Sequence, residues 1–271
     1  MDHDSSATEY ASGKMLAAVQ DGVGLITFNQ PEKRNAMSVE MWDGLAAILD
    51  AWKHAPAVHV VVMAGAGDKA FVSGADISQF EKSRSNADAQ REYDMLTSAG
   101  RARLASFGKP VIARIQGFCL GGGLGIALQA DIRIAAEGSM FGIPAAKLGI
   151  AYGFDMVRRL TALVGPAHAS ALLFTGERID ALEAARIGLV NKVVPAAALE
   201  QTAAAMARRI AANAPLSITG MKLILEQAAR DPGDRDMDAV AQAVATCFDS
   251  ADYTEGRTAF MEKRKPVFRG V

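Results

Sequence analysis

Two short segments of the chain combine glycine with a pattern that could do chemistry. The first is Ser73-Gly74-Ala75-Asp76-Ile77, and the second is Leu120-Gly121-Gly122-Gly123-Leu124. Each follows a short apolar run and is expected to lead straight into a helix. The first N–H groups of a helix have no internal partner and lie at the positive end of its dipole, and glycine lets a ligand approach the backbone closely. The two segments could therefore form an oxyanion hole, in which backbone N–H groups stabilise the negative oxygen of a reacting carbonyl.

The same glycines have a second interpretation, in which they only let a helix pack closely on a sheet. Spacing alone leaves both interpretations open. A dinucleotide-binding GxGxxG motif is excluded, because a template started at Gly121 puts Ile126 at its last glycine and one started at Gly65 puts Ala70 there. The sequence also lacks the P-loop GK[ST], the zinc-binding HExxH and the GxSxG of serine hydrolases.

The elements that must position these segments follow from the hydrophobic pattern. Asp21-Gly22 separates two apolar runs and predicts a β-hairpin, and Ser38 is a candidate N-cap for a helix that ends near His54. Further strands alternate with helices, which predicts parallel pairing through right-handed crossovers. The expected strands cover 15–20, 23–29, 59–63, 71–72, 111–115, 131–135 and 189–194, and the expected helices of this part cover 38–54, 86–107, 121–130 and 152–163.

The chain is therefore expected to be an α/β protein with three parts. Residues 1–14 are acidic and rich in Ser and Ala and predict a flexible tail, residues 15–195 predict a β/α core, and residues 196–271 predict a helical, Ala-rich region. A length of 271 residues is enough for one large core.

Composition limits the classes of partner. Half of the residues are hydrophobic, and 29 Lys and Arg against 30 Asp and Glu leave a formal charge of −1, which disfavours nucleic-acid binding. Two cysteines without CxxC spacing support neither a disulfide framework nor a zinc site, so no metal is expected. No apolar run is long enough to span a membrane, and the N-terminus has no signal-like stretch. The cytoplasm is the expected location.

Several motifs, in this order and spacing, resemble the crotonase (enoyl-CoA hydratase/isomerase) superfamily. The resemblance runs from about residue 15 to the end of the chain. The matching segments are Phe28-Asn29-Gln30-Pro31, Arg34-Asn35-Ala36-Met37, the two glycine segments with Gly117-Phe118-Cys119 before the second, Phe174-Thr175-Gly176, residues 184–194 and Lys263-Arg264-Lys265-Pro266-Val267-Phe268.

The resemblance implies a spiral of ββα units, a C-terminal helical region used in trimer assembly, and an acyl-CoA substrate. The N–H groups of Ala75 and Gly122 would hold the thioester oxygen. Coenzyme A would enter as part of the substrate, with no separate cofactor, and the assembly would be a homotrimer or a dimer of trimers. The residues that the resemblance assigns to CoA contacts are Lys33, Arg34, Ala36, Ser73, Asp76, Ile77, Leu120 and Lys263, and Lys263 would be supplied by a neighbouring subunit.

The sequence departs from the family at two positions that matter for chemistry. Hydratases of this family place a water between two glutamates, and the matching residues are Gly125 and Ala145. Water addition needs a base for the water and an acid for the carbon, and neither residue can move a proton. The departure argues against ordinary hydration.

Tyr152 and Asp155 are the remaining candidates for chemistry. Tyr152 falls where a decarboxylase of the family, methylmalonyl-CoA decarboxylase, has a tyrosine that contacts the substrate carboxylate, although that enzyme has a histidine at the position of Ala75. Tyr152 could equally be a packing residue, and Asp155 a first-turn carboxylate favoured by the helix dipole.

The sequence thus predicts an enzyme that stabilises a thioester enolate, with decarboxylation or double-bond isomerisation favoured over hydration. The alternatives are hydration through other residues and CoA-ester binding without turnover.

Overall fold

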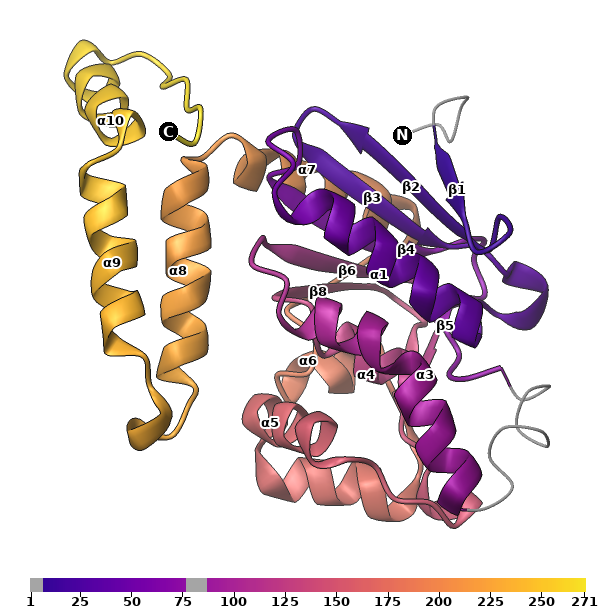
Figure 1. Ribbon diagram of the computed structural model, residues 1–271. Helices are drawn as coiled ribbons and strands as arrows, with labels where there is room; N and C mark the ends of the chain where they lie inside the picture. The colour runs from indigo at the N-terminus through magenta and orange to yellow at the C-terminus, as the bar shows by residue number, and fades with distance from the viewer. Residues whose placement is uncertain (1–6, 77–86) are drawn as a thin grey trace.

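A seven-stranded sheet forms the body of the protein in a computed structural model that describes residues 7–76 and 87–271 (Figure 1). Its strand order is β1-β2-β3-β4-β6-β8-β11, and from β3 onward neighbouring strands are parallel, as the sequence predicts. The strands are β1 (Thr8–Tyr10), β2 (Met15–Gln20), β3 (Val23–Phe28), β4 (Val60–Gly65), β6 (Val111–Ile115), β8 (Ile132–Ala136) and β11 (Lys192–Val194).

A smaller sheet carries the two glycine segments. Its order is β10-β9-β7-β5, and its strands are β5 (Ala70–Val72), β7 (Phe118–Leu120), β9 (Met140–Gly142) and β10 (Arg178–Asp180). Strands β5 and β7 are parallel neighbours, so the segments that follow them emerge at the same edge of the sheet. The last three strands are absent from the sequence prediction, because three residues are too few to show a period of two.

All the helices predicted for the described residues form, with shifted ends, and one further helix, at residues 181–186, was not predicted. They are α1 (Val39–Lys53), α3 (Ala87–Ala105), α4 (Gly122–Ala127), α5 (Phe154–Thr175), α6 (Ala181–Arg186), α7 (Ala196–Ala211), α8 (Pro215–Ala228), α9 (Met237–Phe248) and α10 (Ala251–Glu262), with short 3₁₀ turns η1 (Pro31–Lys33), η3 (Ala146–Leu148) and η4 (Pro232–Asp234). Ser38 caps α1 by accepting the Met41 N–H. Helix α5 is longer than predicted because Gly165, with φ of 74°, joins two helical stretches.

Alternation along β4 divides the core into two layers. Val60 and Val62 lie in the cluster that packs beneath α7, whereas Val61 and Met63 lie in the larger cluster formed with α1, α4 and the small sheet. Helix α7 presents alanines and leucine one turn apart to the sheet, namely Leu199, Ala203 and Ala207. The parallel strands are thus buried on both faces, which is why they read as continuous apolar runs.

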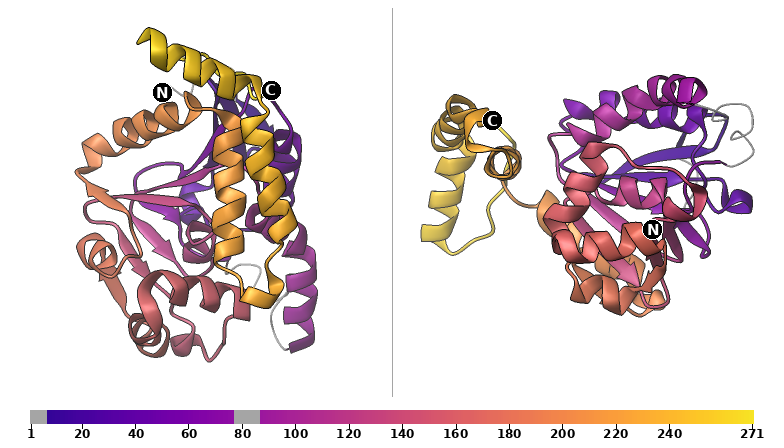
Figure 2. Two further views of the ribbon diagram at one scale, coloured as in Figure 1. Left: turned by 90° about the vertical axis from the view of Figure 1, so that its left-hand side faces the viewer. Right: turned by 90° about the horizontal axis from the view of Figure 1, so that it is seen from below.

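Helices α8–α10 and the tail after them form a separate layer, the C-terminal arm (residues 215–271), which stands beside the body (Figures 1 and 2). Lys222 of α8 joins the arm to the sheet. Its Nζ donates to the Lys109 carbonyl at 2.8 Å and pairs with Asp131 at 2.9 Å. The helical region predicted from residue 196 therefore divides, because α7 covers the sheet and only the arm leaves it.

One local prediction is wrong. Residues 8–14 are not a loose tail, because Thr8–Tyr10 pairs antiparallel with Met15–Ala17 through a turn in which Ala11, Ser12 and Gly13 have positive φ. In the first glycine segment, residues 73–76 are not helical, and the helix predicted to follow them lies outside the described residues. Ala75 instead forms an isolated parallel bridge with Met37, while Ile77 lies outside the described residues.

No helix in the described ranges 7–76 and 87–271 is long and apolar enough to cross a lipid bilayer.

The packing role of the second glycine segment gives a testable prediction. A Cβ built on Gly123 would overlap the carbonyl of Val72 in β5, whereas one built on Gly122 meets no atom closer than 3.9 Å. We expect Gly123→Ala to lower the free energy of unfolding by about 1–3 kcal/mol, because α4 must move off the sheet. Gly122→Ala is the matched control and should leave stability unchanged or slightly higher. Equal unfolding midpoints in urea for the two variants would contradict this account.

Candidate active site

Two hydrogen bonds hold the first glycine segment in place without using the N–H of Ala75. The Met37 N–H donates to the Gly74 carbonyl at 2.8 Å, and the Asp76 N–H donates to the Met37 carbonyl at 2.9 Å. Gly74 has φ of 123°, a conformation that glycine adopts without strain. The bridge fixes Ala75 and leaves its own amide to face away from Met37.

The second segment brings the Gly122 amide to the same place. Gly121, with φ of 52°, turns the chain from β7 into α4 and donates to the Gly142 carbonyl at 2.9 Å. A Cβ on Gly122 would lie 3.9 Å from the Ala75 nitrogen. Among residues 7–76 and 87–271, neither the Ala75 nor the Gly122 N–H has an acceptor. The structure therefore brings the two predicted donors together at a helix start, where the dipole favours negative charge.

Tyr152 reaches this turn. Its Oη lies 3.0 Å from the point where a Cβ on Gly121 would sit, and Pro144 Cδ lies 3.9 Å from the same point. The ring is half-buried and packs against the main core. Tyr152 is thus beside the pair of amides, whereas Asp155 is exposed in the first turn of α5. Within the described part of the chain, no hydrogen bond or ion pair joins Asp155 to the two amides.

The positions that the resemblance gives to carboxylates carry no acid. Gly125 lies in α4, one turn after Gly121, and faces the side chain of Met156. Ala145 is 5% exposed and begins the turn η3, where its carbonyl accepts from Leu148 and Ile150. Cys119 lies close by in β7, but burial raises the pKa of its thiol and keeps it protonated. None of these residues can act as a base at neutral pH.

The residues expected to contact CoA gather next to Ala75. Lys33 Nζ pairs with the nearly buried Asp76 at 2.7 Å, and the Ser73 N–H donates to the Arg34 carbonyl at 3.1 Å. Asn35 holds this turn. The sequence prediction assigned no role to Asn35. This residue is fully buried, accepts the Gln30 N–H, and donates to the carbonyls of Ala66, in the loop before β5, and of Ala70, the first residue of β5.

Because Asn35 fixes the turn, Ala36 is buried directly before the Met37 bridge. Five of the predicted contact residues therefore share one surface region, in which Lys33 and Arg34 are exposed, Ser73 is half-buried, and Ala36 and Asp76 are buried. Ile77 lies outside the described residues.

A cavity of about 380 Å³ adjoins the second glycine segment and includes the predicted Leu120. It is lined by Leu120, Gly142, Pro144, Lys147, Gly176, Glu177 and Arg178. Phe118, two residues before Leu120, carries two guanidinium groups over its ring, those of Arg34 at 5.3 Å and Arg178 at 5.2 Å. Arg178 could not be found from the sequence, since only the pairing of β10 with β9 brings it here.

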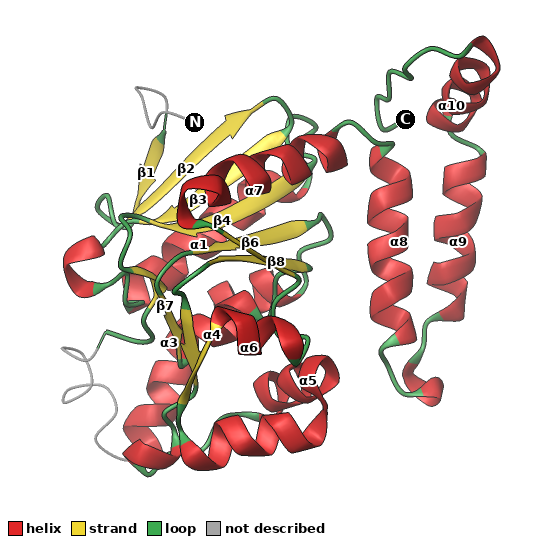
Figure 3. Ribbon diagram, turned by 180° about the vertical axis from the view of Figure 1, so that it is seen from behind, coloured by secondary structure: helices red, strands yellow, loops and turns green. Residues whose placement is uncertain are grey.

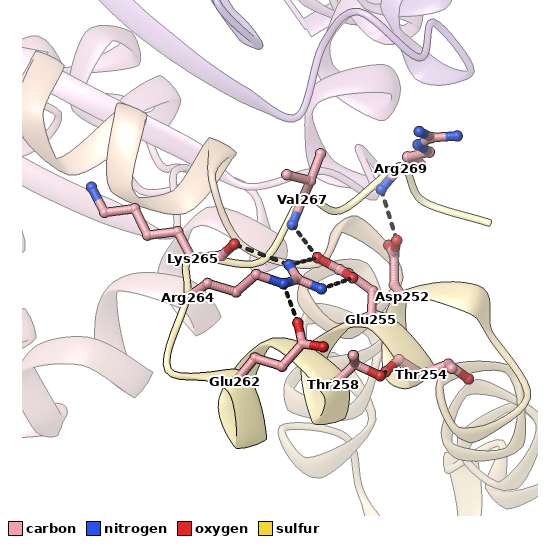
Figure 4. Close-up of polar contacts among 9 residues, drawn as sticks. All are labelled: Asp252, Thr254, Glu255, Thr258, Glu262, Arg264, Lys265, Val267 and Arg269. Atoms are coloured by element: carbon pink, nitrogen blue, oxygen red, sulfur yellow. Dashed lines mark hydrogen bonds and ion pairs between the residues drawn. The ribbon is translucent and has the colours of Figure 1, made fainter.

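Lys263 lies elsewhere in the single chain. It ends α10 in a left-handed conformation, and Figure 3 shows α10 at the far side of the arm from α4. Its neighbour Arg264 pairs with Glu255 and Glu262 at 2.6 Å each, and the Glu255 carboxylate also accepts the Val267 N–H (Figure 4). These contacts fasten the tail to α10, so one chain alone does not bring Lys263 to the two amides.

Comparison with known proteins decides the family. Residues 18–271 match the Enoyl-CoA hydratase/isomerase family. The chain belongs to this family, the crotonase superfamily. A short-chain-enoyl-CoA hydratase from Clostridium acetobutylicum is 38% identical over 90% of this chain and 92% of its own length. A carnitinyl-CoA dehydratase from Citrobacter koseri is 33% identical over 90% and 94%.

A solved crotonase structure confirms the fold. It is titled an enoyl-CoA hydratase/carnithine racemase from Magnetospirillum magneticum, and it superposes with a TM-score of 0.91 at 35% identity over 95% of this chain and 96% of that one. The α/β fold class and the crotonase resemblance predicted from the sequence are both confirmed.

The tail network gives a prediction for the arm. Hydrogen bonds from Arg264, and then from the Val267 N–H, lower the pKa of Glu255 to about 2. We expect Glu255→Ala to speed hydrogen exchange at the Val267 amide, and Glu262→Ala, which loses only the pair with Arg264, to leave that amide protected. Because the pKa of Glu255 is lower in the folded chain than its unfolded value near 4.5, the charged carboxylate stabilises the fold at pH values above 4.5. This stabilisation is lost as the pH falls toward 2. Mass-spectrometric exchange that is equal in both variants would refute the assignment.

Proposed function

We propose that the protein is an acyl-CoA enzyme that stabilises a thioester enolate. The observation that carries the proposal is the convergence of the Ala75 and Gly122 amides at one point beside Tyr152. The thioester oxygen accepts both N–H groups, and the negative charge that develops on it lies at the start of α4. Coenzyme A enters as part of the substrate, and no separate cofactor takes part.

The CoA portion lies along the surface region around Asp76. Arg34 and Lys33 provide positive charge for the phosphates, although Lys33 also pairs with Asp76. Leu120 borders the acyl end through the adjoining cavity. Lys263 would come from a neighbouring subunit in a homotrimer or a dimer of trimers. Support for such an assembly comes from apolar side chains on the arm that a subunit contact would cover. Among them are Leu225, Phe260 and Met261, whose exposed fractions are 71%, 82% and 80%.

Decarboxylation fits the groups at the site. The bond between Cα and the carboxylate breaks, CO₂ leaves, and the electron pair moves onto the thioester oxygen, where the two amides stabilise the enolate. Solvent water then supplies the proton that adds to Cα. This route needs a group that orients the carboxylate, a role for the Tyr152 hydroxyl, and it needs no base to remove a proton from carbon.

Isomerisation is the second route to a thioester enolate. A proton is removed from Cα of a 3-enoyl ester, the two amides stabilise the resulting dienolate, and the proton is added at Cγ, a transfer open to Tyr152 or Asp155. Hydration through other residues is favoured only by the names of relatives such as the Clostridium hydratase. A protein that binds CoA esters without turnover is the remaining alternative.

The test compares substrates in the wild type and in Gly122→Pro. With enoyl-, malonyl- and methylmalonyl-CoA esters followed by mass spectrometry, we expect decarboxylated or isomerised product, and hydration of crotonyl-CoA well below a kcat/KM of about 10⁴ M⁻¹s⁻¹. Gly122→Pro removes one N–H at a first helical position that tolerates proline. It should lower kcat by about 10²–10³.

Gly122→Ala is the matched comparison, since it keeps the N–H and its Cβ would meet only the Ala75 nitrogen at 3.9 Å and the Gly74 carbonyl carbon at 4.0 Å, which are ordinary van der Waals distances. Full activity in a folded Gly122→Pro protein would refute the oxyanion hole. Binding of every ester without any product would favour the non-catalytic alternative, and crotonyl-CoA hydration above the stated value would refute the exclusion of hydration.

Tyr152→Phe tests the role of the hydroxyl. The ring remains, so thermal stability should change little. If the hydroxyl orients a carboxylate or moves a proton, kcat should fall by about 10² or more on the best substrate. Asp155→Asn is the matched comparison. A silent Tyr152→Phe together with an inactive Asp155→Asn would replace the decarboxylase assignment with proton transfer by Asp155.

A further inference from the structure

Two glycines one turn apart give α4 a face without side chains. Gly121 precedes the helix and Gly125 lies four residues later, where its N–H donates to the Gly121 carbonyl at 3.0 Å. Residues four apart in a helix share a face. Gly122, where a Cβ would lie 3.9 Å from the Ala75 nitrogen, is at the edge of this bare face. Any acyl group attached to a carbonyl at the two amides therefore begins beside it.

The segment that leads into α5 covers this face with two side chains. Tyr152 Oη stands over Gly121, and Met156 stands over Gly125, where its Sδ, Cε and Cγ lie 3.3, 3.6 and 3.9 Å from the position of a Cβ. Met156 is half-buried and packs against the main core. Tyr152 and Met156 are also four residues apart, so the hydroxyl covers the first glycine and the thioether covers the second.

The chemistry of the two groups differs sharply. The hydroxyl can donate and accept a hydrogen bond, whereas the thioether has no proton to give and is a weak acceptor. Methionine is also flexible and polarisable and adapts its shape to apolar neighbours. The bare face of α4 thus has one polar and one apolar neighbour, and the apolar one lies within 3.3 Å of the position that a Cβ on Gly125 would take.

We propose that Met156 is a specificity-determining residue that contacts the acyl carbons next to the thioester and keeps water from them. The inference rests on the proposed acyl-CoA function. An apolar acyl group would lie on this face of α4. The Met156 thioether would limit how large or branched that group can be at the carbons next to the thioester.

The first test detects the contact directly. With ¹³C-methyl-labelled methionine in the full chain, the Met156 methyl signal is assigned by its loss in Met156→Leu. We expect that signal to shift when butanoyl-CoA, a saturated ester that cannot react by the proposed routes, is added, and to stay unchanged with CoA alone. Binding of butanoyl-CoA by calorimetry without a shift at Met156 would overturn this inference and leave the proposed function intact. Absence of any binding would overturn both.

The second test measures selectivity. Met156→Ala opens space beside the acyl carbons, so the ratio of affinities for 2-methylbutanoyl-CoA and butanoyl-CoA should rise about tenfold, the size of effect that one methyl group has in an apolar pocket. Met237→Ala is the matched control, because Met237 is 60% exposed at the start of α9. An unchanged ratio in a folded Met156→Ala protein that still binds butanoyl-CoA would overturn the proposal.

Discussion

The site depends on a single backbone bridge between two segments that are far apart in the sequence. Met37 uses both its N–H and its carbonyl on the residues that flank Ala75, so Ala75 is fixed from one side and its amide stays available on the other. A side chain could not hold a donor with the same accuracy, because it would have rotamers to choose from. The buried amide of Asn35 supports the bridge from behind by fixing the left-handed turn that delivers Met37.

The glycines around α4 show that the two interpretations of such a motif apply to different residues. Gly123 lets the helix lie against β5, Gly121 makes the turn, and Gly122 supplies the N–H. Gly125 leaves space that Met156 fills. One short stretch therefore combines packing, backbone geometry and chemistry, and each role constrains its own residue.

The sequence predicted those features that depend on local signals. Asp21-Gly22, the Ser38 cap and the apolar runs of the parallel strands are local, and all three are found. The position of Met156 over Gly125 and that of Arg178 over Phe118 depend on tertiary packing, so no local pattern could indicate them. The strand Thr8–Tyr10 was missed because its polar residues pair only through the turn that follows them.

The arm meets the sheet at a distance from the proposed site. Lys222 contacts the chain just before β6 and, through Asp131, just before β8, while Asp131 also accepts the Val111 N–H. One lysine thus aligns the arm with the beginnings of two strands, at the opposite ends from those that lead to the glycine turns. A change at this residue could redirect the arm without disturbing the proposed oxyanion hole. With the proposed assembly through the arm, evolution could in this way alter how copies of the protein associate while the proposed reaction of each copy is preserved.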